Sequence, residues 1–332
     1  MVMPESTTAA TPQPTLEQPL LARLSIAMFA IVMGVGGLGN AWALAHAVFG
    51  APLVISQLLL ALALIVFALL AIAHLAKLGF HFKAVVAEFA HPVRSSFFPA
   101  TSVAAIVLSI GTRVYSVELA QGLWWFGAVL HLLLAVTLIR RWITHAQDES
   151  VLTPAWFIPI VGNILVPVGG VPLGHVEISW FFFSVGLVFW LMFFSIVLHR
   201  VLFVPAMSVR SVPTLFILLA PPSIGLSAYL AFTGGFAGPL AHILYSLALF
   251  IAILLVTLLR HVSHGPFFMS WWAMTFPVDG WAGATLAYAH AQPSGYARAI
   301  AVFALASASL VVLLIAGRTA FYMASGKAFR EE

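Results

Sequence analysis

The sequence predicts an all-α integral membrane protein of ten transmembrane helices. Of the 332 residues, 62% are hydrophobic and only 7% are charged, and the apolar residues fall into ten stretches long enough to cross a bilayer. A soluble domain carries roughly 25% charged residues, so this chain cannot cover its surface with polar groups. The chain has no cysteine, which excludes disulfides and thiol chemistry.

Each expected span has a length of about 17–25 residues, which crosses the hydrocarbon core of a membrane. In chain order the spans are 23–48, 52–76, 95–112, 117–140, 153–171, 176–199, 212–232, 237–260, 267–290 and 296–318. Residues 1–20 are rich in Thr, Pro and Ala and are expected to form a disordered tail. Residues 21–322 are expected to form one transmembrane domain, and residues 323–332 a short cytoplasmic tail.

The basic residues predict the orientation. An even number of spans puts both termini on one side of the membrane. With that side in the cytoplasm, 12 of the 14 Lys and Arg residues are cytoplasmic, and only Arg113 and Arg298 lie outside. This distribution favours a bacterial inner-membrane protein with both termini in the cytoplasm. The basic residues are scattered singly at helix ends, which argues against a nucleic-acid partner.

Prolines mark the odd-numbered spans. Pro99, Pro159, Pro221 (followed by Pro222) and Pro277 are spaced by 60, 62 and 56 residues, close to one helical hairpin each. Proline removes a backbone donor and kinks a helix, and in lipid the freed carbonyl needs a partner. We therefore expect these kinks to face protein or a water-filled cavity. The first span has glycines in place of a proline.

Side-chain size divides the spans in the same way. Small residues cluster near the prolines, whereas the even-numbered spans are bulky, as at 180–183 (WFFF). Small residues permit close backbone approach or leave a lumen clear. We therefore expect five helical hairpins in a quasi-fivefold ring, with odd helices around a central pore and even helices facing lipid. The alternative is that these are the prolines that membrane helices commonly carry.

Five motifs, in order along the chain, resemble the tellurite-resistance/dicarboxylate transporter family. This family includes TehA-like proteins, fungal malate permeases and plant slow anion channels. The motifs are GLGNAW at 37–42, HPVRSSFFP at 91–99, PAWFIPIVG at 154–162, PTLFILLAPPSIGLSAY at 213–229 and SWWAMTFP at 270–277. Each is weak alone, and the resemblance covers roughly residues 25–318.

The resemblance implies ten helices in five hairpins, a central pore in each subunit of a homotrimer, and a phenylalanine that plugs the pore midway. That phenylalanine corresponds to Phe276. Helix geometry agrees, because Phe276 lies nine residues after Phe267, at the start of the ninth span, and therefore roughly 13 Å into the bilayer. Alternatively, Phe276 packs in a helix interface, as most membrane phenylalanines do.

Three polar residues lie within odd-numbered spans. Asp279 is an intramembrane acid, which is a functional candidate by default. It could couple transport to protons, line the pore, or make a structural hydrogen bond. Asn40 and Asn163 could line the pore or bond a kinked backbone, and we favour the structural role for both.

Other polar residues are expected to be structural. Arg113 and Glu118 could pair with each other or attract anions at the outer mouth. His131 and His242 lie on even-numbered spans and are expected to make interhelical or subunit contacts. No HExxH, CxxC or phosphate-binding glycine loop is present, so the sequence predicts no enzyme, cofactor or metal site.

Together these features predict an anion channel of the inner membrane, with small inorganic anions as its permeant partners. The alternative is a proton-coupled carrier of C4-dicarboxylates such as malate, or of tellurite. A receptor or scaffold without transport is a third interpretation, which the short tails disfavour.

Overall fold

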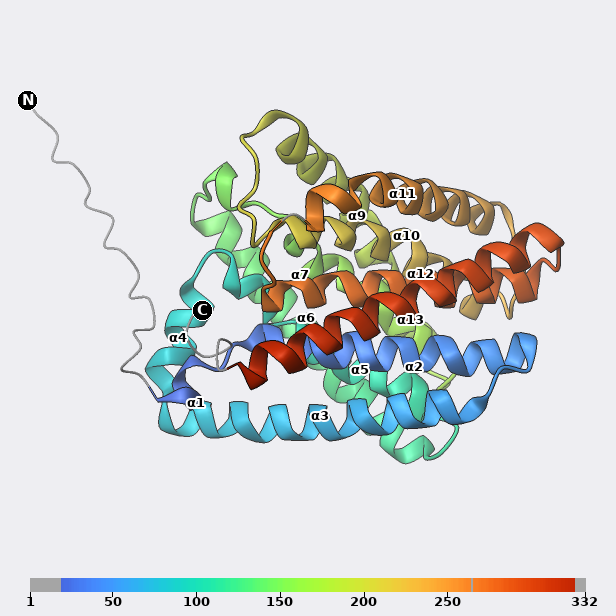
Figure 1. The fold of residues 1–332 in the computed structure, drawn as a ribbon, viewed down its shortest axis with the longest axis horizontal. Helices are drawn as coiled ribbons and strands as arrows, with labels where there is room; N and C mark the ends of the chain where they lie inside the picture. Colours follow the sequence, from blue (N-terminus) through green and yellow to red (C-terminus); the bar gives the residue numbers. More distant parts are fainter. Residues whose placement is uncertain (1–18, 264, 326–332) are drawn as a thin grey trace, which may run out of the picture.

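The computed structural model describes residues 19–263 and 265–325, and these ranges contain helices and no strand (Figure 1). Eight helical segments are long and apolar enough to cross a membrane. They are Ile26–Phe49, Leu53–Phe80, Arg94–Thr112, Val117–Thr144, Val176–Phe203, Val212–Phe232, Pro239–Val262 and Gly295–Ala324. Residues 1–18 and 326–332, which belong to the two expected tails, lie outside the described residues.

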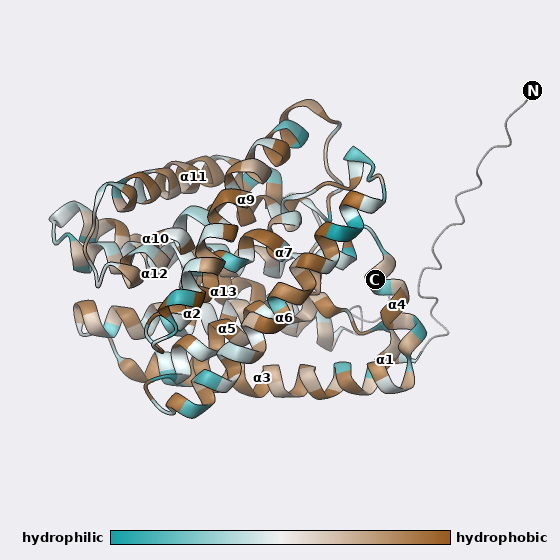
Figure 2. Cartoon of the chain, turned by 180° about the vertical axis from the view of Figure 1, so that it is seen from behind, coloured by the Kyte–Doolittle hydropathy of each residue, from teal (hydrophilic) through white to brown (hydrophobic). Residues whose placement is uncertain are grey.

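Five helices of 25–30 residues run without interruption and correspond to the even-numbered spans. They are α3 (Leu53–Phe80), α6 (Val117–Thr144), α9 (Val176–Phe203), α11 (Pro239–Ser263) and α13 (Gly295–Ala324). Only 17–33% of their most apolar stretches is buried inside the protein. Figure 2 shows α3 and α11 mostly in brown and pale shades along their length. Their exposed side chains, largely Leu, Ile, Val and Phe, suit contact with lipid.

Each odd-numbered segment begins as a 3-10 helix and continues as an α-helix. The first is η1 (Ile26–Met28) with α2 (Phe29–Phe49), and the second is η2 (Arg94–Phe97) with α5 (Ala100–Thr112). The third runs through η4 (Pro154–Trp156), α7 (Phe157–Val161), η5 (Gly162–Leu165) and α8 (Val166–Gly170). The last two are η6 (Val212–Leu219) with α10 (Ala220–Phe232), and η7 (Met269–Met274) with α12 (Thr275–Ala291).

Four of the five prolines expected to kink these segments lie at or just after a change of winding, and Pro159 lies within the short α-helix between two 3-10 helices. Pro99 precedes α5, Pro159 is in the middle of α7, Pro221 and Pro222 are in the first turn of α10, and Pro277 is in the first turn of α12. The first turn of an α-helix tolerates proline because a backbone N–H there has no partner within the helix.

The odd-numbered segments form the inside of the protein. Three of them bury 67–83% of their most apolar stretches, against 17–33% for the uninterrupted helices. Their small residues allow close packing. At Gly34 of α2, an added Cβ would lie only 2.2 Å from the hydroxyl oxygen of Thr275 on α12. The expected division into bulky outer and small-residue inner helices therefore holds for these spans.

The fifth and ninth expected spans differ from the other eight. Pro154–Gly170 is a shorter apolar helix, broken into four pieces. The helical segment Met269–Ala291 carries Ser270, Thr275 and Asp279, which make it less apolar. By length and composition, the structure thus supports eight of the ten expected spans.

The connection between α3 and η2, which falls between the second and third expected spans, contains a helix. This helix, α4 (Phe82–Ala90), lies near the short α1 (Leu20–Arg23). The guanidinium of Arg141 on α6 donates to the carbonyls of Phe89 and Ala90, at the C-terminal end of α4. These bonds satisfy carbonyls that have no partner within the helix. A further short helix, η3 (Glu149–Val151), lies between α6 and η4.

Candidate functional site

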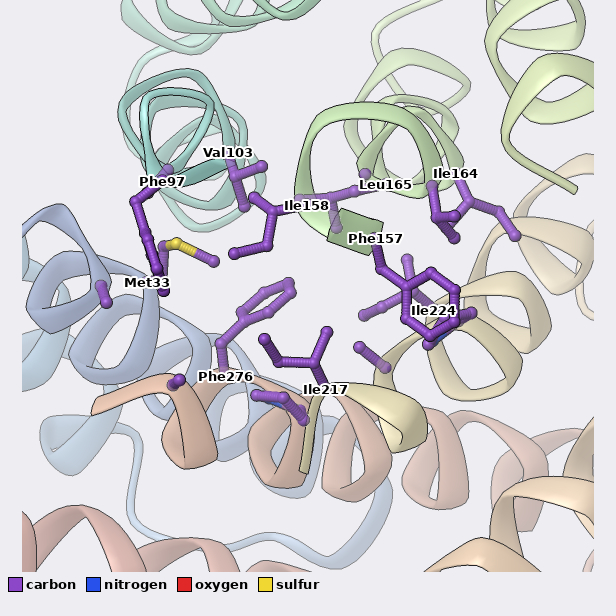
Figure 3. A pocket seen from close by; sticks show the side chains of 18 of the residues that line it. Met33, Phe97, Val103, Phe157, Ile158, Ile164, Leu165, Ile217, Ile224 and Phe276 are labelled. Carbon is purple, nitrogen blue, oxygen red and sulfur yellow. The ribbon is translucent and has the colours of Figure 1, made fainter. Parts of the chain in front are cut away.

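A cavity of about 60 Å³, here called the central cavity, is lined within the described part of the chain only by odd-numbered segments. All five of these segments contribute to it. The lining includes Met33 of α2, Phe97 and Val103 of η2 and α5, Phe157, Ile158, Ile164 and Leu165 of α7 and η5, Ile217 and Ile224 of η6 and α10, and Phe276 of α12 (Figure 3). Almost the whole lining is apolar. The five segments that proline and small residues mark in the sequence therefore meet around one space.

The ring of Phe276 points into the central cavity, between Met33, Ile158 and Ile217 (Figure 3). Phe276 follows the change from η7 to α12, and Pro277 comes directly after it. The side chain is half-buried, whereas Thr275 and Pro277 on either side are buried. The sequence thus singled out a residue that occupies the space shared by the five segments.

A larger hollow of about 1000 Å³, here called the basic vestibule, adjoins the central cavity. The two spaces share Ala30, Phe97 and Ala273 in their linings. Among the described residues, five Lys and Arg side chains line the vestibule but only one acid, Glu88, does so. The basic residues are Arg23, Lys77, Lys83, Arg94 and Arg210. The structure therefore gathers cations at one end of the apolar cavity, where the field favours anions.

Beyond Phe276, one face of α12 borders open space. Phe276, Gly280, Gly283 and Ala287 are half-buried, whereas the residues between them are buried. Their spacing of four, three and four residues places them on one helix face. A Cβ added at Gly283 would meet no atom within 4 Å. This face continues from the central cavity towards the end of α12 that lies away from the vestibule.

The predicted proline positions differ in their relation to the cavity. Pro221 and Pro277 line it, whereas Pro99, Pro159 and Pro222 are buried and absent from its lining. The carbonyl of Pro99 accepts hydrogen bonds from the Ser102 hydroxyl at 2.7 Å and the Val103 amide at 2.9 Å. A polar side chain therefore helps to satisfy the backbone at this change of winding.

Asn40 and Asn163 both bond backbone carbonyls. The Asn163 amide donates to the Ile160 carbonyl at 2.6 Å, where α7 changes to η5, and its side chain is 1% exposed. The Asn40 amide donates to the Val107 carbonyl at 2.9 Å and joins α2 to α5. Neither residue lines the central cavity, so this structure does not support a pore-lining role for them there.

Asp279 also lies outside the lining of the central cavity. Its residue is 1% exposed, and neither carboxylate oxygen has a hydrogen-bond partner among the described residues. The carboxyl packs against Gly37 of α2, where an added Cβ would lie 3.1 Å from the Asp279 Oδ2. Both a pore-lining position in this cavity and a structural hydrogen bond, two of the expected roles, are therefore absent.

His131 and His242, two of the histidines on even-numbered helices, make interhelical contacts, as expected. The His131 ring on α6 lies 2.9 Å from the Ser102 hydroxyl on α5, and His242 on α11 lies 2.6 Å from the Tyr288 hydroxyl on α12. The expected pair between Arg113 and Glu118 is not formed. The Glu118 carboxylate instead accepts a hydrogen bond from Ser116 at 3.0 Å, and no ion pair joins these two described residues.

Two charged side chains that are not among the predicted site residues meet at the vestibule. The Lys77 ammonium lies 2.6 Å from the Glu88 carboxylate, at the junction of α3 and α4. Their spacing of 11 residues across a connection gives no helical signal. Within the described residues, no three His, Asp or Glu side chains are grouped so as to hold a metal ion.

A family model described as voltage-dependent anion channel matches residues 23–320. The S-type anion channel SLAH3 of Arabidopsis thaliana is 28% identical over 305 residues, which are 90% of this chain and 48% of that protein. SLAH2 of the same plant is 26% identical and is covered over 60% of its length. The tellurite resistance protein TehA homolog of Haemophilus influenzae is 23% identical over 91% of both chains. This chain thus spans about half of the plant relatives and nearly all of the bacterial one, and the matches confirm the resemblance seen in the five motifs.

Proposed function

Because the chain belongs to the voltage-dependent anion channel family, we propose that it conducts small anions through the central cavity and that Phe276 is the gate. It is a multi-pass membrane protein of a family whose named relatives are anion channels, transporters and a tellurite resistance protein. One observation carries the proposal. A single apolar cavity, lined by all five odd-numbered segments, holds the Phe276 ring and adjoins the basic vestibule.

The gate would act by excluding water. An aromatic ring across a narrow, apolar lumen prevents an ion from keeping its hydration shell, and such hydrophobic constrictions close a pore by dewetting. Met33, Ile158 and Ile217 around the ring offer no polar side-chain group to replace the lost water. Movement of the ring out of the lumen would open the path.

The preference for anions would come from the vestibule and from backbone dipoles near the winding changes. Lys83 and Arg94 lie in the vestibule lining, whereas no described residue that lines the central cavity is charged. A charged entrance raises the local concentration of counter-ions, and weak sites along the path allow an ion to leave again. Selectivity among small anions is then low and follows their dehydration cost.

We further propose the arrangement in the membrane. Pro154–Gly170 and Met269–Ala291 complete ten crossings, and the five odd-numbered segments form a quasi-fivefold ring. Support comes from the cavity, to which each of these segments contributes. The vestibule end is cytoplasmic, because the positive-inside rule places basic residues there. Both termini are then cytoplasmic, in a bacterial inner membrane, and the protein forms a homotrimer with one pore in each subunit.

A proton-coupled carrier of C4-dicarboxylates or tellurite is the second candidate function. The burial of Asp279 without a hydrogen-bond partner among the described residues favours this carrier function, because such a carboxyl can gain or lose a proton during transport. A carrier requires alternating access, whereas a channel requires only that the gate open.

Current recordings from purified protein in planar bilayers test the proposal. We expect anion-selective currents at symmetric pH, and larger currents for Phe276→Ala. The channel hypothesis fails if Phe276→Ala stays at background while the unmodified protein moves malate only under a pH gradient.

A further inference from the structure

Asp279 is a buried acid whose surroundings leave it without a compensating group. Its carboxylate oxygens have no partner among the described residues, and the residue is 1% exposed. Most buried polar groups in proteins are hydrogen-bonded, so an unpartnered carboxyl needs an explanation.

Three polar side chains near Asp279 along α2 and α12 donate to backbone carbonyls, and the indole nitrogen of Trp281 has no partner among the described residues. The Thr275 hydroxyl donates to the Trp272 carbonyl at 2.8 Å, and the Thr285 hydroxyl donates to the Trp281 carbonyl at 2.9 Å. On α2, the Asn40 amide donates to Val107 of α5. A structural hydrogen bond therefore does not account for the carboxyl.

Titratable groups on the elements packed against α12 do not compensate the carboxyl either. They are His46 on α2, Tyr229 on α10, His242, Tyr245, Arg260 and His261 on α11, and Tyr296, Arg298, Arg318 and Tyr322 on α13. His242 and Tyr245 contact Tyr288, and Arg318 lies over the Trp271 ring. These contacts lie more than two helical turns from Asp279. An ionised carboxylate without a nearby cation is strongly disfavoured in such a place, whereas a protonated carboxyl is neutral.

Asp279 lies beside the proposed permeation path. It is one turn beyond Phe276 and adjacent to Gly280, which belongs to the half-buried face of α12. Gly37, against which the carboxyl packs, is also half-buried. The carboxyl thus packs against one half-buried glycine, and a second half-buried glycine follows Asp279 in the chain. At one helical turn, about 6 Å, and an effective dielectric constant of about 20, a negative charge lowers the local occupancy by an anion roughly a hundredfold.

We propose that Asp279 is a proton-binding site that controls anion permeation. Anions pass when the carboxyl is protonated, and the ionised carboxylate repels them. This inference rests on the proposed function, because it places the carboxyl beside an anion path. It predicts anion flux that falls as the pH rises through the titration of this one side chain.

Chloride flux from liposomes, measured at equal pH on both sides, tests the inference. The background is Phe276→Ala, so that the gate does not limit the flux. Three proteins are compared. The first carries Phe276→Ala alone, the second carries Phe276→Ala together with Asp279→Asn, and the third carries Phe276→Ala together with Glu149→Gln. Glu149 is an exposed carboxyl in η3 and serves as the matched control. We expect flux through the single and control variants to fall roughly tenfold or more as the pH is raised stepwise from acid to alkaline, because the ionised carboxylate repels anions. Flux through the Asp279→Asn variant is expected to stay at the acid level.

The inference is overturned if the Asp279→Asn variant keeps the pH dependence of its parent. A different result, no chloride flux through Phe276→Ala at any pH, contradicts the proposed function instead. Infrared spectroscopy of the unmodified protein tests the proton site without any transport. A carbonyl band of a protonated carboxyl that Asp279→Asn abolishes supports the site, and the same spectrum in both proteins contradicts it.

Discussion

The Lys77 ammonium and the Glu88 carboxylate form a buried ion pair at 2.6 Å, with side chains only 3% and 7% exposed. The pair also fixes the backbone before α2. Lys77 donates to the Leu24 carbonyl at 2.7 Å, and the amide of Ile26 donates to Glu88 at 2.8 Å. One ion pair therefore joins α3 and α4 to the start of the first odd-numbered segment.

Removal of one partner of this pair is expected to be strongly destabilising. Glu88→Gln leaves the Lys77 ammonium buried without its counter-charge, which costs about 3–5 kcal/mol in comparable buried pairs. Thermal unfolding of the purified protein in detergent measures the change. Lys83→Met, which removes an exposed charge from the neighbouring turn, should leave the melting temperature nearly unchanged. Equal melting temperatures for Glu88→Gln and the unmodified protein would show that the pair contributes nothing.

The size of the side chain at position 276 should set the conductance. An apolar constriction that raises the barrier by about 1.4 kcal/mol lowers the rate of passage tenfold. We therefore expect single-channel conductance to increase from Phe to Leu to Ala at position 276, by tenfold or more for Ala. Phe126→Ala on α6 is the control, because this ring is 50% exposed on the outer surface. A gate at Phe276 is contradicted if the conductance does not depend on the size of residue 276, or if Phe126→Ala changes it equally.

The turn at His91 should weaken in mild acid. The His91 Nδ1 accepts hydrogen bonds from the amides of Val93 and Arg94, both at 3.2 Å. Burial, followed by the nearby Arg94 and Arg141, lowers the pKa of the His91 imidazole from its ordinary value of 6.5. A depressed pKa means that this contribution to stability is present above pH 6.5 and is lost as the pH falls from there towards the lowered pKa.

The substitution His91→Asn separates this effect from general acid sensitivity, because Asn keeps an acceptor but does not titrate. As the pH drops below 6.5, we expect the melting temperature of His91→Asn to fall less than that of the unmodified protein. His199→Asn, at an exposed position on α9, should show no such difference. If the melting temperatures of all three proteins change equally with pH, His91 is not the cause of the acid sensitivity.

Glycine is required at position 186 of α9 and not at position 122 of α6. A Cβ at Gly186 would lie 2.6 Å from the backbone nitrogen of Ile164 in η5, so the backbone would have to move. Gly186→Ala should therefore cost about 1–3 kcal/mol, as overpacking does. At Gly122 no atom lies within 4 Å of the added Cβ, and Ala should stabilise the exposed helix by up to ~1 kcal/mol. Melting temperatures that move in the same direction for both variants would refute this packing.

The inner and outer sets of helices could be predicted because their signals are local. A proline within an apolar stretch removes a helical hydrogen bond, so Pro99 and Pro277 indicate interrupted segments without any tertiary knowledge. Bulky apolar residues along α9 likewise indicate contact with lipid. The position of Phe276 followed from the resemblance and from helix geometry, and the structure adds the lining that surrounds its ring.

Other features depend on contacts between distant parts of the chain. The bond from Asn40 to Val107 joins residues 67 positions apart, and no periodicity relates them. Helix α4 is too short for a clear pattern, and its position depends on Lys77 and Arg141, which lie on other helices. The Asp279 carboxyl has no hydrogen-bond partner among the described residues because the neighbouring donors point elsewhere. The directions of those donors cannot be inferred from the local sequence.

The 3-10 windings also affect how far each inner segment reaches. A 3-10 helix rises about 2.0 Å per residue and an α-helix about 1.5 Å. The 8 residues of η6 and 13 of α10 therefore extend about 35 Å, whereas the same 21 residues wound only as α-helix would extend about 31 Å. The extra length lets a 21-residue segment approach the reach of the longer helices outside it. Rewinding η6 as α-helix would shorten the segment by about 4 Å and displace its vestibule end relative to the surrounding helices.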